Sequence, residues 1–120
     1  MTLLTIIKAR NVIDGFAMRD GLSAHLAYWM AKFIAKTEDD NKFYAEGLRK
    51  ITEKYHVTVG EDGMWKTDEN VEDLEKEITE LQDTEAQDPG IKFSLSEISD
   101  CLKVSLQEMY PLLDFIDENT

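Results

Sequence analysis

The 120-residue sequence predicts a single, mainly α-helical domain. Apolar residues recur every three or four positions over most of its length, which is the spacing of one helix face. One stretch, "VTVGEDGMWKT", has instead two short β-prone runs flanking the turn residues "GEDG", which predicts a small β-hairpin. We divide the chain into N-terminal helices (1–56), the hairpin with an acidic helix (57–88), and a short strand with a helical tail (89–120).

The secondary structure of the first residues is not decided by the sequence. Residues 2–7 suit either a short strand or the start of a helix, because paired leucines and isoleucines fit both patterns. Helical spacing over roughly 5–18 favours a helix. Gly21 follows it and can adopt the left-handed conformation that commonly ends helices.

One long helix is predicted over 23–56, with Ser23 as its N-cap. The motif "TEDD", which begins at Thr37, is also a helix-starting pattern, so a kink at this point stays open. Through 22–35 the apolar side chains wrap most of the circumference, which predicts that this half is the hub of the core. From 41 to 55 only one narrow apolar seam remains, beside a basic edge of lysines and arginine.

The next helix, "VEDLEKEITEL", has a single coiled-coil-like seam and is acidic almost everywhere else. Asn70 is its expected N-cap, and "DPG" ends it. A tight connection through the hairpin would return this helix antiparallel to the seam of 41–55, as a helical hairpin. The expected seam pairs are Tyr55 with Val71, Ile51 with Leu74, Leu48 with Ile78, and Tyr44 with Leu81, with Arg49, Lys50 and Lys54 beside the carboxylates of the acidic helix.

The tail combines an alternating run, Ile91, Phe93 and Leu95, with two helix starts. Ser94 with Glu97 and Ser105 with Glu108 are capping-box patterns. The apolar spacing that follows is typical of a compact helix-turn-helix. Pro111 disfavours continuing the last helix unless it restarts at Tyr110.

That helix-turn-helix pattern lacks the charges that DNA binding needs. Residues 92–120 hold two lysines against six acids, so phosphate groups would find few counter-charges. We therefore predict a packing role for the tail and no direct nucleic acid binding.

Charge is distributed unevenly along the chain. The net charge is −12, and 61–88 alone hold twelve acids against two lysines. Such a field repels nucleic acid and anionic membranes and favours basic protein surfaces. The longest uncharged run is too short to span a membrane, and the start lacks the features of a signal peptide. With Cys101 as the lone cysteine, we expect an intracellular protein whose partner is another protein or its own copies.

Catalytic and metal-binding patterns are not found in the sequence. His25 and His56 would lie about 46 Å apart on a straight helix, and neither a zinc motif nor a phosphate-binding glycine loop occurs. We expect structural roles for both histidines and for Cys101. The predictions are no enzyme activity, no metal and no cofactor.

Several segments occur in a characteristic order: "LAYWMAKFIAK", "LRKITEKYH", an acidic glycine-bearing hairpin, "VEDLEKEITEL" and "LLDFIDE". This order resembles a family of small proteins of unknown function from tailed phages of Gram-positive bacteria. The chain departs from that pattern at "GLSA", where proline is expected, and in a shorter hairpin. The resemblance implies a phage origin and location in the host cytoplasm, and it implies no functional residues.

Two functions follow as hypotheses. In the first, an acidic phage accessory protein mimics nucleic acid and inhibits a host or defence protein. In the second, a virion or assembly component self-associates through apolar helix surfaces and exposed aromatics such as Tyr28, Phe43 and Trp65. The candidate partner-binding residues are Glu72, Asp73, Glu75, Glu77, Glu80, Asp83 and Trp65.

Overall fold

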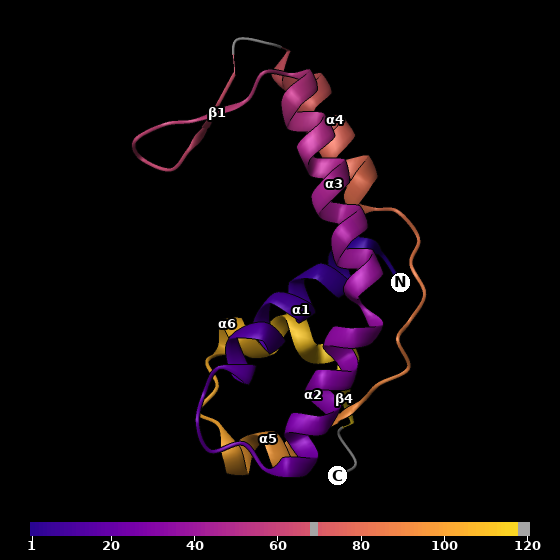
Figure 1. Ribbon diagram of the computed structural model, residues 1–120, viewed down its shortest axis with the longest axis vertical. Coiled ribbons are helices and arrows are strands. Elements are labelled where there is room, and N and C mark those ends of the chain that lie inside the picture. Colours follow the sequence, from indigo (N-terminus) through magenta and orange to yellow (C-terminus); the bar gives the residue numbers. More distant parts are fainter. Residues whose placement is uncertain (68–69, 118–120) are drawn as a thin grey trace.

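The computed structural model describes residues 1–67 and 70–117, and these form a wide helical body with a narrow arm rising from it (Figure 1). The predicted mainly α-helical class with a small antiparallel hairpin is confirmed. Asp68 and Glu69 of the acidic segment, and 118–120 of the predicted tail, lie outside the described residues. The arm contains α3 (Glu38–Lys54), β1 (Thr58–Val59), β2 (Trp65–Lys66) and α4 (Val71–Gln82). The body contains α1 (Leu3–Ala17), α2 (Ala24–Lys36), β3 (Phe93–Ser94), α5 (Leu95–Cys101), α6 (Leu106–Met109), the 3₁₀ helix η1 (Tyr110–Phe115) and β4 (Ile116–Asp117).

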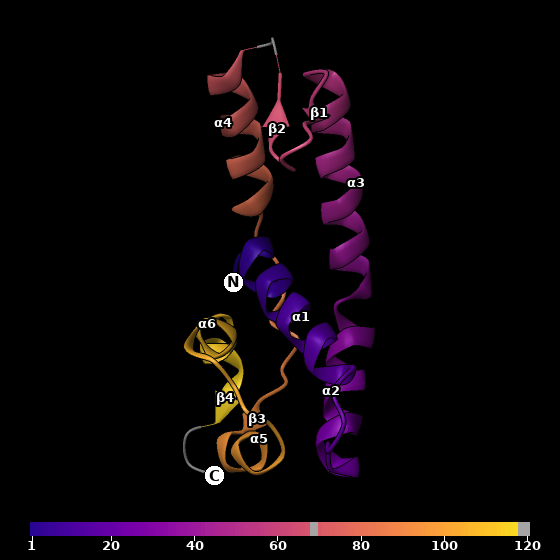
Figure 2. The ribbon, with the colours of Figure 1, turned by 90° about the vertical axis from the view of Figure 1, so that its left-hand side faces the viewer.

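Helix α1 forms the centre of the core. It begins at Leu3, because the Thr2 hydroxyl accepts a hydrogen bond from the backbone N–H of Thr5. The open choice for the first residues therefore resolves as helix. The helix crosses the middle of the molecule (Figure 2), and the residues it buries are Leu3, Ile6, Ile7, Ala9, Arg10, Ile13 and Phe16.

The prediction that 22–35 forms the hub of the core is wrong. Helix α2 lies at one edge of the body (Figure 2) and buries only Leu26, Met30 and Phe33. Tyr28 remains 55% exposed. The other apolar residues of α2 are mostly alanines and aromatic side chains that remain exposed, so the number of apolar residues around the helix overstated how much of it is buried.

The long helix predicted over 23–56 is interrupted at Thr37, where the "TEDD" motif left a kink open. The Thr37 side chain does not cap α3. It is fully buried, and its hydroxyl donates to the Phe33 carbonyl at 2.7 Å. The buried Arg10 guanidinium donates to the Ile34 carbonyl at 3.2 Å and to the Glu38 carboxylate at 2.6 Å. Arg10 thus connects the end of α2, the start of α3 and the middle of α1.

The tail closes the core from the other side. Phe93 of β3 pairs in parallel with Ile116 of β4. The β4 strand was not predicted, because two residues are too few to show an alternating pattern. The Phe33 ring lies 5.9 Å from that of Phe93 and 5.0 Å from that of Phe115. Pro111 lies in the first turn of η1, where a missing N–H breaks no hydrogen bond.

Ser94 and Ser105 cap the helix starts in the tail as predicted, but of the two predicted capping boxes only the one of Ser105 and Glu108 is complete among the described residues. Ser94 accepts a hydrogen bond from the Glu97 backbone, and Ser105 with Glu108 forms a complete capping box. The two helices between these caps and η1 are short, with α6 only 4 residues long.

Candidate protein-binding surface

The acidic helix α4 lies beside α3 along the arm (Figure 2). Asn70 caps it by accepting from two backbone N–H groups of the first turn. Near the tip, the Lys54 ammonium is 3.0 Å from the Glu77 carboxylate. Nearer the body, the Tyr44 hydroxyl accepts from the Gln82 side chain at 3.4 Å. Residue numbers rise along α3 as they fall along α4, so the two helices run in opposite directions.

Only part of the basic edge of α3 reaches α4. Lys54 does so. The pKa of Glu77 is held below its ordinary value chiefly by a hydrogen bond with the Tyr55 hydroxyl and, to a smaller extent, by Lys54. Arg49 instead pairs with Glu46 and Glu53 on its own helix. Among the described residues, Arg49 therefore forms no ion pair with the acidic helix. Spacings of three and four residues bring its partners within reach on α3 itself.

The six predicted carboxylates of α4 fall into two groups. Glu77 faces α3 and is half-buried. The other five are exposed, and among the described residues none of them forms an ion pair: Glu72, Asp73, Glu75, Glu80 and Asp83. At a rise of 1.5 Å per residue, these five outward acids are spaced on average about 4 Å apart along the helix axis. The exposed Lys76 lies four residues from both Glu72 and Glu80, so the outer face of α4 carries five carboxylates and one cation and is net negative.

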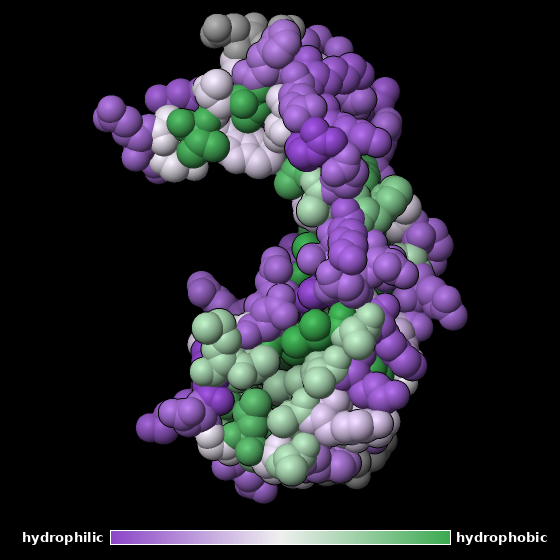
Figure 3. Space-filling model, in the orientation of Figure 1, coloured by the Kyte–Doolittle hydropathy of each residue, from purple (hydrophilic) through white to green (hydrophobic). Residues whose placement is uncertain are grey.

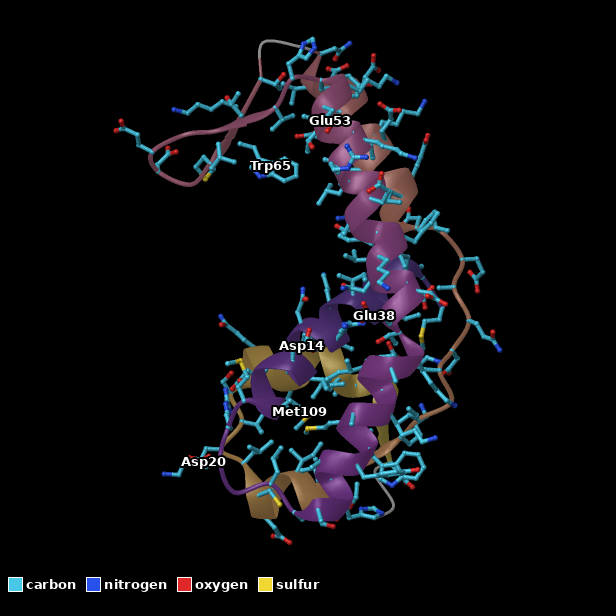
Figure 4. All side chains as sticks on the ribbon, viewed as in Figure 1. Asp14, Asp20, Glu38, Glu53, Trp65 and Met109 are labelled. Atoms are coloured by element: carbon cyan, nitrogen blue, oxygen red, sulfur yellow. The ribbon has the colours of Figure 1, made fainter. Side chains whose placement is uncertain are left out.

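The β-hairpin projects from the tip of the arm over the concave side of the molecule (Figure 1). Val59 pairs with Trp65, and Gly63 has a φ of +77°, a left-handed conformation that suits glycine in this tight turn. The Trp65 side chain extends under the hairpin towards the arm (Figure 4). The hairpin therefore overhangs one face of the two arm helices.

A groove of about 400 Å³ lies between the hairpin and α4. The space-filling view shows apolar side chains on the inner side of the hairpin, next to the strongly polar arm (Figure 3). The lining residues of the groove are Val57, Trp65, Lys66, Thr67, Val71, Leu74, Glu75 and Ile78. Trp65 and Glu75, both predicted contact residues, thus meet at one place.

One exposed apolar group was missed in the sequence. Leu106, Tyr110 and Leu113 are 82%, 72% and 54% exposed, although the tail was assigned to packing. Their spacing of four and three residues is the signal that could have identified a shared face. Beside them, a groove of about 390 Å³ separates the tail from α1.

The histidine predicted to be structural in α2 is part of a small polar cluster. The His25 Nδ1 atom is 2.9 Å from the Glu97 carboxylate, and its Nε2 atom accepts from the Trp29 indole at 3.1 Å. Both ring nitrogens are therefore engaged. Among residues 1–67 and 70–117, no three histidine, cysteine or acidic side chains are arranged to hold a metal ion. In the same residues, no helix is long and apolar enough to cross a membrane.

The chain matches no protein family model, no curated protein and no solved structure. The resemblance to phage proteins therefore stays a prediction, and the function has to be argued from the surface itself.

Proposed function

We propose that this chain is a non-enzymatic phage accessory protein that acts in the host cytoplasm by binding a partner protein through the outer face of α4. The observation that carries the proposal is the row of exposed carboxylates on that helix, which form no ion pair within residues 1–67 and 70–117. Exposed charges that form no pair inside the molecule remain available to a partner, and they attract a surface of opposite sign. The partner surface is therefore basic.

The spacing of these charges favours a surface that otherwise binds nucleic acid. One strand of duplex DNA carries a phosphate every 3.4 Å along the helix axis. The outward acids of α4 recur at a similar interval, about 4 Å, along a straight rod. A protein that neutralises phosphates with lysine and arginine would find similar negative charges on α4. Occupying that surface would inhibit nucleic acid binding by the host or defence protein.

Charge reversal tests the proposal. In the triple variant Glu72→Lys, Glu75→Lys, Glu80→Lys, we expect the loss of competition with duplex DNA for basic DNA-binding proteins of the host. Glu77 is left unchanged because its pair with Lys54 supports the arm. Competition by the parent protein should weaken steeply as salt rises, because the contacts are between exposed charges.

A matched control separates a specific surface from bulk charge. The triple variant Asp20→Lys, Asp39→Lys, Asp100→Lys changes the net charge equally, and all three residues are exposed and outside α4. It should keep competing with DNA. Equal loss in both triple variants, or no loss in either, would contradict binding through α4.

A second candidate, a virion or assembly role, is favoured by the exposed apolar face of α6 and η1. Leu106 and Tyr110 are the most exposed members of that face, and exposed apolar patches often mark contacts between proteins. Light scattering should then show a stable oligomer that Leu106→Ser with Tyr110→Ser returns to monomers. A parent protein that is monomeric at high concentration would contradict this role.

A further inference from the structure

We infer that the groove between the β-hairpin and α4 is an anchor pocket that takes a large apolar side chain from a basic segment of the partner protein. This inference rests on the proposed function and adds to it a defined place of contact and the chemistry of the segment that fits there.

The groove has apolar walls from two different elements. Trp65 of β2 forms one wall and is 48% exposed, while Val71 at the start of α4 is 49% exposed and forms the other. Leu74 is buried below them, and Ile78 is half-buried one turn further along. A side chain that enters this groove would remove apolar surface from water on both walls. Burial of this kind is the main favourable term in most protein association.

The groove is preformed, because the hairpin is fastened to the arm. The Thr67 hydroxyl donates to the Tyr55 carbonyl at the end of α3. The backbone N–H of Val57 donates to the Thr52 carbonyl at 2.9 Å, which joins the other strand to the same helix. Both ends of the hairpin are thus tied to α3. A partner would not have to order this wall on binding, which lowers the entropic cost of association.

The charges around the groove select a basic occupant. Glu75 lines the groove itself, and Glu72 lies three residues earlier on α4, so both carboxylates are available at this end of the helix. One cation, Lys66, also lines the groove, but its ammonium group lies against Gly60 in the hairpin, away from α4. The groove therefore offers an apolar floor with an acidic edge.

Charge also argues against a second copy of the chain as occupant. Each copy has a net charge of −12, and the segment 61–88, which supplies all but one of the lining residues of the groove, holds twelve acids against two lysines. Two such surfaces repel when they are brought together. In a lysine- or arginine-rich segment with one apolar side chain per turn, the apolar side chain would pack on the floor of the groove and the cations would pair with its acidic edge. Tryptophan is also among the residues that most often dominate binding energy at such contacts.

The probe for this pocket is a synthetic amphipathic helical peptide of leucine and lysine. The variant Trp29→Phe leaves Trp65 as the only tryptophan, so its emission reports on the groove. Adding the peptide should shift that emission to shorter wavelength as the indole leaves water. A second peptide with the same lysines, but with alanine in place of leucine, should bind at least tenfold more weakly.

Substitutions in the two walls show which residues contribute to binding. The affinity of each variant for the leucine-lysine peptide is measured by calorimetry. Trp65→Ala and, independently, Val71→Ser should each lower the affinity at least tenfold. Phe43→Ala is the matched control, because Phe43 is an exposed aromatic residue of α3 outside the groove. It should leave the affinity unchanged. Circular dichroism of each variant confirms that the helices remain, and the use of two walls keeps the test valid if one variant fails to fold.

The outcomes separate this inference from the proposed function. If both wall variants and the alanine peptide bind as well as the parent pair while the α4 charge reversal abolishes binding, the anchor pocket is overturned and the acidic contact surface stands. If the charge reversal also leaves binding unchanged, both fail. A dimer of the free protein that Trp65→Ala dissociates would show that a second copy fills the groove, and would overturn the basic occupant.

Discussion

The body and the arm are stabilised by different interactions. In the body, the side chains of Phe16, Phe33 and Phe115 have no exposed surface at all. In the arm, α3 has no buried residue and α4 has only Leu74 among the described residues. The body is therefore stabilised by a packed core, and the arm by a single seam and by its attachments. A surface that contributes little to folding is free to vary in charge, which suits a contact surface.

The attachments of the arm to the body are few and specific. Arg10 joins α1 to the start of α3. The return from α4 is joined to the N-terminus by backbone hydrogen bonds, from Leu3 N–H to the Thr84 carbonyl and from Ala86 N–H to the Met1 carbonyl, both at 2.8 Å. With so few attachments, we expect the arm to unfold at lower denaturant than the body.

The largest expected effect is in the body. Phe33→Ala removes a fully buried ring that packs against two others, and should lower the free energy of unfolding by about 3–5 kcal/mol. Leu74→Ala in the arm should cost less, about 2 kcal/mol, because its neighbours are half-exposed and can relax into the space. Urea unfolding followed by circular dichroism measures both values.

The two tryptophans separate the regions in the same experiment, since Trp29 lies on α2 and Trp65 on β2. With Trp65→Phe the emission reports the body, and with Trp29→Phe it reports the arm. Leu74→Ala should move the arm transition to lower urea and leave the body transition nearly in place. Coincident transitions in every variant would show that the two regions form one cooperative unit.

The second largest effect on stability is expected at Arg10, which connects the body to the arm. Arg10→Met keeps the length of the buried side chain and removes its hydrogen bonds to the Ile34 carbonyl and to Glu38. The expected loss is about 1.5–3 kcal/mol, the range for hydrogen bonds to charged groups. Arg49→Met is the control, because that arginine is exposed and pairs only on its own helix among the described residues. It should change thermal stability much less. Equal effects would mean that Arg10 does not hold the arm.

The sequence predicted the elements better than their burial. Caps such as Ser23, Asn70 and Ser105 were predictable because a helix start depends on a few neighbouring residues. The role of Arg10 was not, because its partners lie 24 to 28 residues away. The carboxylates of α4 could be identified from their density alone. The groove could not, since it depends on where the hairpin places Trp65.

A smaller effect is expected in the pH dependence of stability, through the contact between Arg10 and Glu38. The Arg10 guanidinium, chiefly through its hydrogen bond, holds the pKa of Glu38 below its ordinary value of 4.5. Between the folded and unfolded pKa the unfolded chain binds more protons, so stability rises with pH there. The contribution of Glu38 is complete above about pH 4.5 and is lost as the pH falls through the folded pKa.

Unfolding of the parent protein and of Glu38→Gln, compared from about pH 3 to pH 7, measures this contribution. The stability difference should be largest at neutral pH and shrink in acid. In an Arg10→Met background the same substitution should have almost no pH-dependent effect, because the interacting partner is gone. A difference that persists in that background would assign the shift to another group.

The smallest effect compares one glycine in each region. Gly15 lies in α1, where an added Cβ would have no neighbouring atom within 4 Å, so Gly15→Ala should stabilise the protein by roughly 0.5–1 kcal/mol through helix propensity. Gly47 lies in α3, where a Cβ would come 2.9 Å from the Cδ1 atom of Leu81 on α4. Gly47→Ala should therefore give a smaller gain or a loss, because Leu81 has to move out of the seam. In a Leu81→Ala background the alanine at 47 should recover the full gain. Equal gains in stability at both glycines in the parent background would show that Leu81 does not pack closely against Gly47.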